Sequence, residues 1–407
     1  MLADNLLNFQ QSLHNILSES ASAAFMTTID NSGNMNIDKD CKNKLNSMAD
    51  TFGKKFADEA ALCMAANGIK AYVFDSLRPT PELSFAVKYR ESIAGIVITA
   101  SHNPKEYNGY KVYWEDGAQV LAPHDTGIID EVNKVKIEDV KFEGNPDLIE
   151  IIGGEMDYDY MTAVKEAMID QDVILRQKDL NIVYSAMHGT GRVLVPLCLR
   201  SWGFQNINVV PEQMIVDGDF PTVVSPNPEN AEAMTLGMKL GTKLNADLVV
   251  ATDPDADRVG IMVRTGDGDF KVISGNQTGV LLIDYLIGAW KRAGKLPANG
   301  TILKSLVSTE MARAIAEANG LKCFDTFTGF KFLAQKKDQL EESGEGTVLL
   351  AFEESNGYMF GSFVRDKDAV TAALVLTEMA AWYADQGMTL YDAMQALYKK
   401  YGFYGEK

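Results

Sequence analysis

The chain has 407 residues, of which 46% are hydrophobic and 23% are charged. This length allows roughly two to four domains, and the composition excludes collagen, low-complexity polymers and intrinsically disordered proteins. The 56 acidic residues outnumber the 38 basic ones and give a formal net charge of −18, which repels nucleic acid and anionic membrane surfaces. An anionic substrate would therefore need a site made locally positive by a metal ion, arginines or helix N-termini.

The cysteines indicate a reducing compartment, and the hydropathy predicts no membrane-spanning helix. The four cysteines are far apart in the sequence and none forms a C-x-x-C pair, as is typical of cytosolic proteins without a zinc site. No basic and apolar leader opens the sequence. The most apolar helical stretch, residues 369–383, is too short and too polar to cross a bilayer. We expect a soluble, cytoplasmic protein that binds neither nucleic acid nor membrane.

Helical and strand patterns alternate along most of the chain. Residues 1–55 are expected to form a loop-rich segment. In the first block, residues 56–155, the pattern predicts a helix, a strand, a second helix and a second strand, at residues 57–67, 69–74, 82–89 and 94–99. In the second block, residues 156–267, it predicts strands at 181–184 and 247–251 and helices that end near Gly203 and Gly241.

The third block, residues 268–400, continues the alternation. Strands are predicted at residues 301–306, 322–325 and 347–352, with helices from Thr309, Gly329 and Asp366. Strands that alternate with helices favour right-handed βαβ units. The predicted fold class is therefore α/β, with three consecutive α/β domains, mixed but mainly parallel sheets, and joints near Glu155 and Asp267.

The first of three polar loops follows the strand at 94–99. Residues 99–104 (TASHNP) place Ser101 beside His102 in a tight turn, and Lys111 follows shortly after. Open α/β sheets bind ligands at the carboxyl ends of their strands, so Ser101 could present its hydroxyl to a ligand. Turn chemistry alone also explains this composition, and for this loop by itself both interpretations stay open.

The second loop, residues 252–258, directly follows an apolar strand and contains Asp253, Asp255 and Asp257. Three carboxylates at alternate positions repel one another unless a cation lies among them. Ligands that are all oxygen select a hard divalent ion such as Mg²⁺, and the glycine and glutamate spacing of a calcium-binding EF-hand is absent. A magnesium site is favoured over a solvated acidic turn.

The third loop, residues 352–358, carries Glu353 and Ser355, which project to one side of an extended segment and suit neighbouring sugar hydroxyls. Glutamates at strand ends are more often surface residues. A fourth candidate combines Gly329 and Lys331, whose turn and cation could approach a sugar or a phosphate. A plain helix start explains this pair equally well.

Taken together, the loops resemble those of the α-D-phosphohexomutase superfamily in their residue motifs, their order and their spacing. Segments 77–81 (LRPTP) and 352–355 (FEES) are most similar to its phosphoglucomutase and phosphopentomutase branch. In that family, four domains surround a central cleft and each contributes one loop. The resemblance implies a Mg²⁺-dependent phosphosugar mutase that moves phosphate between the C1 and C6 (or C5) hydroxyls of a phosphorylated sugar. The transfer would pass through a phosphoserine and a bisphosphate, with glucose 1,6-bisphosphate as activator.

The resemblance also implies roles for individual residues. Ser101 would carry the phosphoryl group, and Mg²⁺ would bind that phosphate together with the three aspartates. Arg258 would lie beside the phosphates, His102 follows the serine in the family motif, and Lys111 would handle the transferred proton if burial lowers its pKa. The sugar-contacting positions of the family are matched by Glu353 and Ser355.

Two parts of the family pattern have no match. Residues 1–55 show no counterpart of the glycine- and arginine-bearing strand pair with which members begin, and residues 401–407 fall where a fourth, phosphate-binding domain would start. We therefore expect a truncated or rearranged chain, or a partner chain that supplies the missing part. Two alternatives remain: a weakly active or non-catalytic chain that binds sugar phosphates, and a phosphatase that forms an aspartyl phosphate on Asp253.

Overall fold

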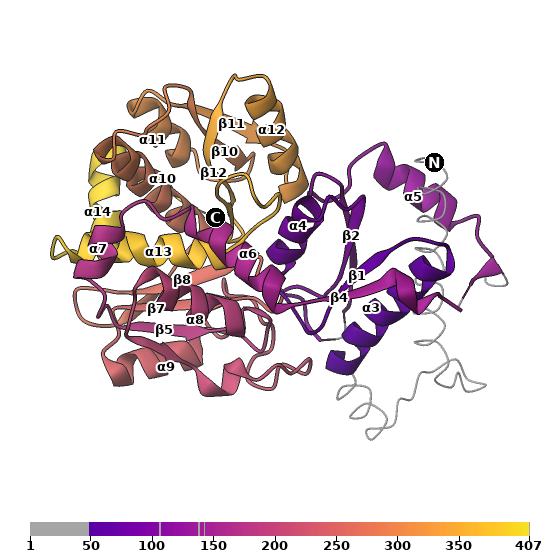
Figure 1. Cartoon of the computed structure of the whole chain (residues 1–407). Helices are drawn as coiled ribbons and strands as arrows, with labels where there is room; N and C mark the ends of the chain where they lie inside the picture. The colour runs from indigo at the N-terminus through magenta and orange to yellow at the C-terminus, as the bar shows by residue number, and fades with distance from the viewer. Residues whose placement is uncertain (1–48, 106, 137–138, 142, 407) are drawn as a thin grey trace, which may run out of the picture.

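The computed structural model describes residues 49–105, 107–136, 139–141 and 143–406. Three α/β units follow one another along the chain (Figure 1). Most of the predicted loop-rich segment, residues 1–48, lies outside the described residues. Its last residues, 49–55, belong to helix α3 (Ala49–Ala66), so the prediction of a loop there is wrong. The helix begins before the apolar periodicity from which its start was predicted.

The first unit contains two separate strand pairs. After α3 its elements are β1 (Ala71–Phe74), α4 (Thr80–Tyr89), β2 (Ala94–Ile98), β3 (Tyr110–Trp114), α5 (His124–Val132) and β4 (Ile149–Ile152). Strand β1 pairs with β4 in parallel, and β2 pairs with β3 antiparallel. A cavity of about 1000 Å³ is lined by α3, α4, β1 and β2 and reaches Ser101.

The second unit has one five-stranded sheet. Its elements are α6 (Gly154–Lys165), α7 (Gln171–Arg176), β5 (Ile182–Ser185), α8 (Gly191–Trp202), β6 (Ile207–Val209), α9 (Thr235–Leu244), β7 (Leu248–Thr252), β8 (Val259–Arg264) and β9 (Phe270–Ile273). The strand order is β6-β5-β7-β8-β9. Strands β5, β6 and β7 are parallel, whereas β8 and β9 are antiparallel to their neighbours.

The two predicted helix ends of this unit have different outcomes. Helix α8 ends at Gly203, whose φ of 124° is accessible to glycine, as predicted. Helix α9 runs through Gly241 and ends three residues later, at Leu244, where Asn245 takes the left-handed conformation. A Cβ atom at Gly241 would lie 2.9 Å from Val249 of β7. The glycine therefore allows close packing of the helix on the sheet rather than ending the helix.

The third unit contains a four-stranded sheet and the C-terminal helices. Its elements are α10 (Gly275–Arg292), β10 (Gly300–Ser305), α11 (Met311–Ala318), β11 (Lys322–Thr326), α12 (Phe330–Glu342), β12 (Thr347–Glu353), β13 (Gly357–Met359), α13 (Ala369–Ala384) and α14 (Leu390–Tyr401). The strand order is β11-β10-β12-β13, with β13 antiparallel to β12. The predicted α/β class with three consecutive domains is confirmed, and the sheets are mixed because short return strands pair antiparallel.

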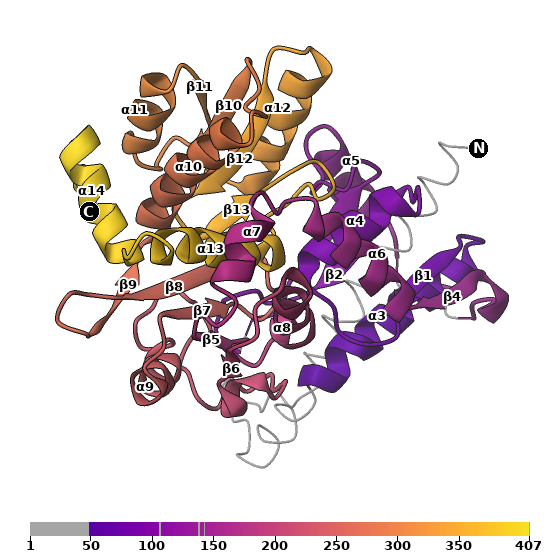
Figure 2. The same cartoon turned by 60° about the vertical axis from the view of Figure 1, so that its left-hand side comes forward.

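Helix α13 joins the second and third units. It is apolar on nearly all sides and lies between the two units in both views (Figures 1 and 2). Its buried Glu378 accepts hydrogen bonds from the backbone N–H groups of Ile169 and Asp170 and, at 2.5 Å, from the hydroxyl of Tyr285. At the start of the helix, Tyr160 donates a hydrogen bond of 2.8 Å to Asp368. These buried bonds fix the relative placement of the two units.

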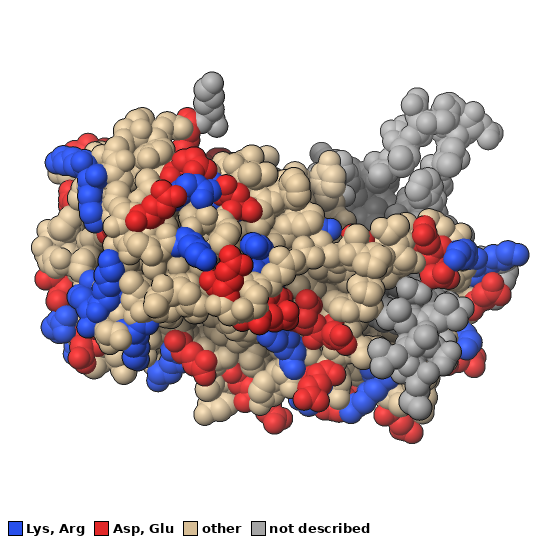
Figure 3. Space-filling view, turned by 90° about the horizontal axis from the view of Figure 1, so that it is seen from above, with Lys and Arg blue, Asp and Glu red and all other residues tan. Residues whose placement is uncertain are grey.

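Charged side chains of both signs lie on the surface. Figure 3 shows acidic and basic side chains on the described part of one face. Of the helices that the structure describes, none is both long enough and apolar enough to cross a membrane.

Candidate active site

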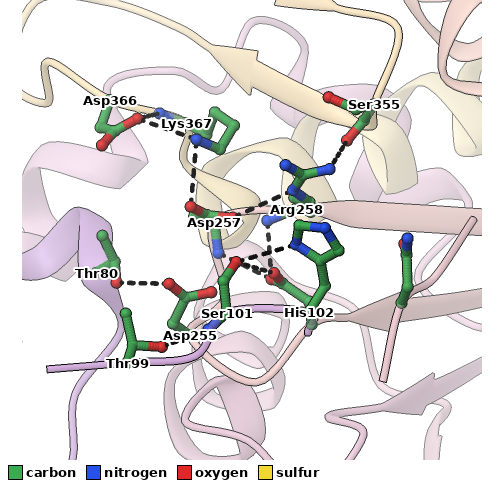
Figure 4. A network of polar contacts seen from close by, with 12 residues as sticks. Thr80, Thr99, Ser101, His102, Asp255, Asp257, Arg258, Ser355, Asp366 and Lys367 are labelled. Atoms are coloured by element: carbon green, nitrogen blue, oxygen red, sulfur yellow. Dashed lines mark hydrogen bonds and ion pairs between the residues drawn. The ribbon is translucent and has the colours of Figure 1, made fainter. Parts of the chain in front are cut away.

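Ser101 lies at the centre of the site (Figure 4). The chain leaves β2 and places Ser101 in the left-handed region, with a φ of 52°, where its N–H donates to Thr99 Oγ1 at 2.8 Å. The Ser101 hydroxyl donates to Asp253 Oδ2 at 3.2 Å and lies 3.2 Å from His102 Nδ1. The strained turn therefore presents a serine of the first unit, only 8% exposed, to a carboxylate of the second.

The three predicted aspartates converge on this serine. They lie in the turn between β7 and β8, all three are buried, and one carboxylate oxygen from each lies within 4.8 Å of the others. The backbone N–H groups of Asp257 and Arg258 both donate to Asp253 Oδ1, at 3.1 and 3.0 Å. These bonds close the turn around Asp253, so the side chains at alternate positions face one point.

Two lysines from different units neutralise the aspartates. Lys111 of β3 places its Nζ 3.0 Å from Asp255 Oδ2 and 3.4 Å from Asp257 Oδ2. Lys367, just before α13, places its Nζ 3.2 Å from Asp257 Oδ2. Burial alone would raise the pKa of Asp257, but these two charges outweigh it and hold the pKa below its ordinary range. Burial raises the pKa of Asp253, and the two neighbouring carboxylates raise it further.

The aspartates fit a hard divalent cation. Within the described structure, Oδ1 of Asp255 and Oδ1 of Asp257 are buried and accept no hydrogen bond. A buried carboxylate oxygen without a partner is costly, and an all-oxygen donor set is the kind that Mg²⁺ prefers. Asp253, Asp255 and Asp257 could therefore hold Mg²⁺ next to Ser101.

The third loop, residues 352–358, contacts the loop that carries the three aspartates, residues 252–258, which we call the metal loop. The N–H of Val259 donates to the carbonyl of Asn356 at 3.1 Å, and Arg258 Nη1 donates to the carbonyl of Ser355 at 3.2 Å. The turn between β12 and β13 thus places Glu353 and Ser355 over the site. Burial raises the pKa of Glu353, although the charges of Lys367 and Arg258 oppose this shift.

The remaining predicted residues lie around this centre. Burial lowers the pKa of His102, and the charge of Arg258 adds to the effect. The pKa of Lys111 is raised, because Asp255 and Asp257 outweigh the lowering by burial. The condition set for proton transfer by Lys111, a pKa lowered by burial, is therefore not met in this arrangement. Lys331 Nζ lies 3.6 Å from Asp125 Oδ2 of α5, and Gly329, with a φ of 109°, directly precedes α12.

Three residues of the site were not predicted from the sequence. Lys367 and its neighbour Asp366 belong to a charged run before α13, and such a run also fits an ordinary helix start. Thr80, in the LRPTP segment, donates to Asp255 Oδ2 at 3.1 Å. The available signal was that a charged run directly precedes the most apolar helix of the chain, where a solvent-exposed location is unexpected.

Family models match all three units. Residues 49–138 match domain I of the phosphoglucomutase/phosphomannomutase family, described as alpha/beta/alpha, residues 158–266 match domain II, and residues 274–401 match domain III. Each match contains one of the three loops described above. The order of the domains in the family is the order of the units in this chain.

Individual proteins give the same result. The chain is 36% identical over 361 residues to a phosphopentomutase of Mus musculus and 35% identical over 358 residues to a phosphoglucomutase of Staphylococcus haemolyticus. These alignments cover 86% and 87% of this chain but 58% and 64% of the relatives, so the chain spans about three-fifths of their length. The open form of the Paramecium phosphoglucomutase pp63/parafusin has a similar fold, with a TM-score of 0.70 at 20% identity over 98% of this chain and 71% of that one.

Proposed function

The chain belongs to the α-D-phosphohexomutase superfamily, in the phosphoglucomutase and phosphopentomutase branch, and from this premise we propose that it moves a phosphoryl group between two hydroxyls of a sugar phosphate. One observation carries the proposal: the buried hydroxyl of Ser101 contacts Asp253 across two units, among three carboxylates that fit a divalent ion. In this proposal the substrate is a hexose or pentose phosphate, the activator is glucose 1,6-bisphosphate and the compartment is the cytoplasm.

The reaction divides into two transfers on Ser101. In the first, a sugar hydroxyl bonds to the phosphorus of phosphoserine, the bond from Ser101 Oγ to phosphorus breaks, the hydroxyl proton passes to a base of the site, and Ser101 Oγ takes up a proton. The resulting bisphosphate turns around. In the second transfer, Ser101 Oγ bonds to the phosphorus of the other phosphoryl group and loses its proton to a base of the site or to solvent, while the bond from that phosphorus to the sugar oxygen breaks and the sugar oxygen takes up a proton.

The cations of the site stabilise the transferring group. Arg258 Nε is buried and has no hydrogen-bond partner among the described residues, so it can donate to a phosphate oxygen. Mg²⁺ bound to the three aspartates would offset the charge of the phosphoryl group. The Lys111 ammonium lies beside the same point and favours the approach of an anionic substrate in a protein whose net charge is −18.

Glu353 and Ser355 would orient the sugar. Both lie in the loop that Arg258 contacts through the carbonyl of Ser355. This hydrogen bond holds the two sugar-contacting residues close to the metal loop. Glu354 is engaged elsewhere, because its Oε2 accepts hydrogen bonds from Ser305 at 2.7 Å and Ser308 at 3.1 Å. These bonds fix the Glu354 side chain on the side of Ser305 and Ser308. Its neighbours in the chain, Glu353 and Ser355, would then face the substrate.

Isomerisation of glucose 1-phosphate to glucose 6-phosphate tests this function. The assay contains Mg²⁺ and glucose 1,6-bisphosphate, and product is detected with a glucose 6-phosphate dehydrogenase. We expect turnover by the wild-type chain and none by Ser101→Ala. Ribose 1-phosphate is assayed in parallel, because the branch contains pentose enzymes. Phosphate release without isomerisation would contradict the proposal and favour the aspartyl-phosphate phosphatase.

A further inference from the structure

Asp366 is a buried carboxylate that connects the first unit to the third. It is 1% exposed, and its Oδ2 accepts hydrogen bonds from the hydroxyl of Tyr113 at 2.6 Å and from Gln119 Nε2 at 2.8 Å. Both donors come from the first unit. Its other oxygen, Oδ1, accepts the backbone N–H of Lys367 at 2.8 Å. Every oxygen of this carboxylate is therefore engaged next to the site.

Strand β3 carries two side chains that reach the site from the first unit, Lys111 and Tyr113. Lys111 and Tyr113 are two positions apart, so their side chains project from the same face of the strand. Lys111 reaches Asp255 and Asp257, while Tyr113, which is fully buried, reaches Asp366. A single strand thus aligns the aspartates of the second unit with the carboxylate of the third.

Asp366 also contacts the flexible end of Lys367. Lys367 Nζ lies 3.4 Å from Asp366 Oδ1 and 3.2 Å from Asp257 Oδ2, as Figure 4 shows. A lysine stem has four carbons and many rotamers, so one carboxylate does not fix its ammonium group. The stem also passes close to Gly357, where a Cβ atom would collide with it. Two carboxylates and the close packing of the stem on Gly357 therefore determine where Nζ lies.

We propose that Asp366 is a positioning residue that holds Lys367 Nζ at the metal triad, and that the Tyr113 hydroxyl makes this placement depend on contact between the first and third units. The inference deepens the proposed function, on which its kinetic test rests. Lys367 would then be held at the triad when the two units meet around a substrate. If they separate, Asp366 loses two donors and the lysine loses its fixed position.

The test compares two tyrosines of the same strand. Tyr113→Phe removes the donor to Asp366. The control is Tyr110→Phe, because the Tyr110 hydroxyl is buried without a hydrogen-bond partner among the described residues. We expect Tyr113→Phe to lower kcat about tenfold, the factor that roughly 1.4 kcal/mol produces, with little change in KM, and Tyr110→Phe to match the wild type. Asp366→Asn should behave like Tyr113→Phe, and Asp366→Glu should recover part of the loss.

A second readout does not depend on turnover. Lys367 is 6% exposed, and its rate of acylation by an amine-reactive ester can be followed by peptide mass spectrometry, with the buried Lys304 as internal reference. Freeing the side chain should raise the Lys367 rate about tenfold in Tyr113→Phe and Asp366→Asn and leave Lys304 unchanged. Unchanged kcat and acylation in both variants would overturn the inference. If the wild-type chain shows no turnover but Lys367 is acylated faster in Tyr113→Phe and Asp366→Asn than in the wild type, the positioning role is supported and the proposed function is refuted.

Discussion

Phosphorylation of Ser101 should tighten Mg²⁺ binding at the three aspartates. When Mg²⁺ displaces the proton that burial favours on Asp253, the three buried carboxylates carry three negative charges, and three cations face them: Lys111, Lys367 and Arg258. The ionised carboxylate of Asp366 beside Lys367 adds a fourth negative charge, so that Mg²⁺ leaves an excess of one positive charge in a buried place. A phosphate on Ser101 brings about −1.5 to −2 charges to an oxygen that lies 3.2 Å from Asp253, and this offsets the excess.

The size of the effect follows from Coulomb's law. Two unit charges 4 Å apart interact by about 4 kcal/mol at an effective dielectric constant of about 20. If repulsion between the phosphate and the carboxylates removes half of one such interaction, about 2 kcal/mol remains, which is roughly a thirtyfold change in Kd. Calorimetric titration of Mg²⁺ into phosphorylated and unphosphorylated protein measures it, with Ser101→Ala treated identically as control. Equal affinities for the two forms would refute the charge-balance argument.

Three further predictions concern single substitutions. Asp257→Asn leaves the two site lysines without their shared carboxylate and should lower the free energy of unfolding by about 3 kcal/mol or more. Asp253→Asn keeps a side-chain oxygen that accepts the backbone N–H of Asp257, and the carboxyl group that it replaces already has a raised pKa. The free energy of unfolding should therefore fall by about 1 kcal/mol or less. Urea unfolding that shows the same loss in both would contradict the opposite pKa directions. Gly189→Ala places a methyl group against the backbone of the metal loop and should weaken Mg²⁺ binding at least tenfold, a loss of about 1.4 kcal/mol. Gly266→Ala, where the added methyl meets open space, should leave Mg²⁺ affinity unchanged, and equal affinities in both glycine variants would exclude the packing argument. Burial raises the pKa of Glu82 to about 9, so the folded protein retains a proton that the unfolded chain has released, and stability falls as the pH rises toward that value. Glu82→Gln should therefore exceed the wild type in stability by a margin that grows from about pH 5 to about pH 8, and a constant margin would refute this.

The sequence contains most of the information on the main elements and on the first two loops. Apolar runs bounded by turn residues are a local signal, and they predict β2 and β7, which are followed by Ser101 and the three aspartates. The short antiparallel strands β3 and β13 were not predicted, because three to five residues give too little periodicity to distinguish a strand from a loop. Their place in the sheets depends on partners that are distant in sequence.

The electrostatics of the site could not be predicted from the sequence. Lys111 was a candidate from its motif, but the direction of its pKa shift depends on the two aspartates of another unit that face it. Lys367 comes from a third segment, about 110 residues after the metal loop, and it reaches Asp257 only because α13 packs between the units. Spacing along a chain identifies which residues can act, whereas packing between units decides which charges meet.

The residue that holds the phosphoryl group distinguishes a phosphoserine mutase from an aspartyl-phosphate phosphatase. The protein is incubated with glucose 1,6-bisphosphate and Mg²⁺, digested, and searched by mass spectrometry for phosphopeptides, with Ser101→Ala as control. We predict an acid-stable phosphate on Ser101 of the wild-type chain and no phosphate in the corresponding peptide of the variant. An unmodified Ser101, or a hydroxylamine-sensitive phosphate on Asp253 instead, would contradict the account.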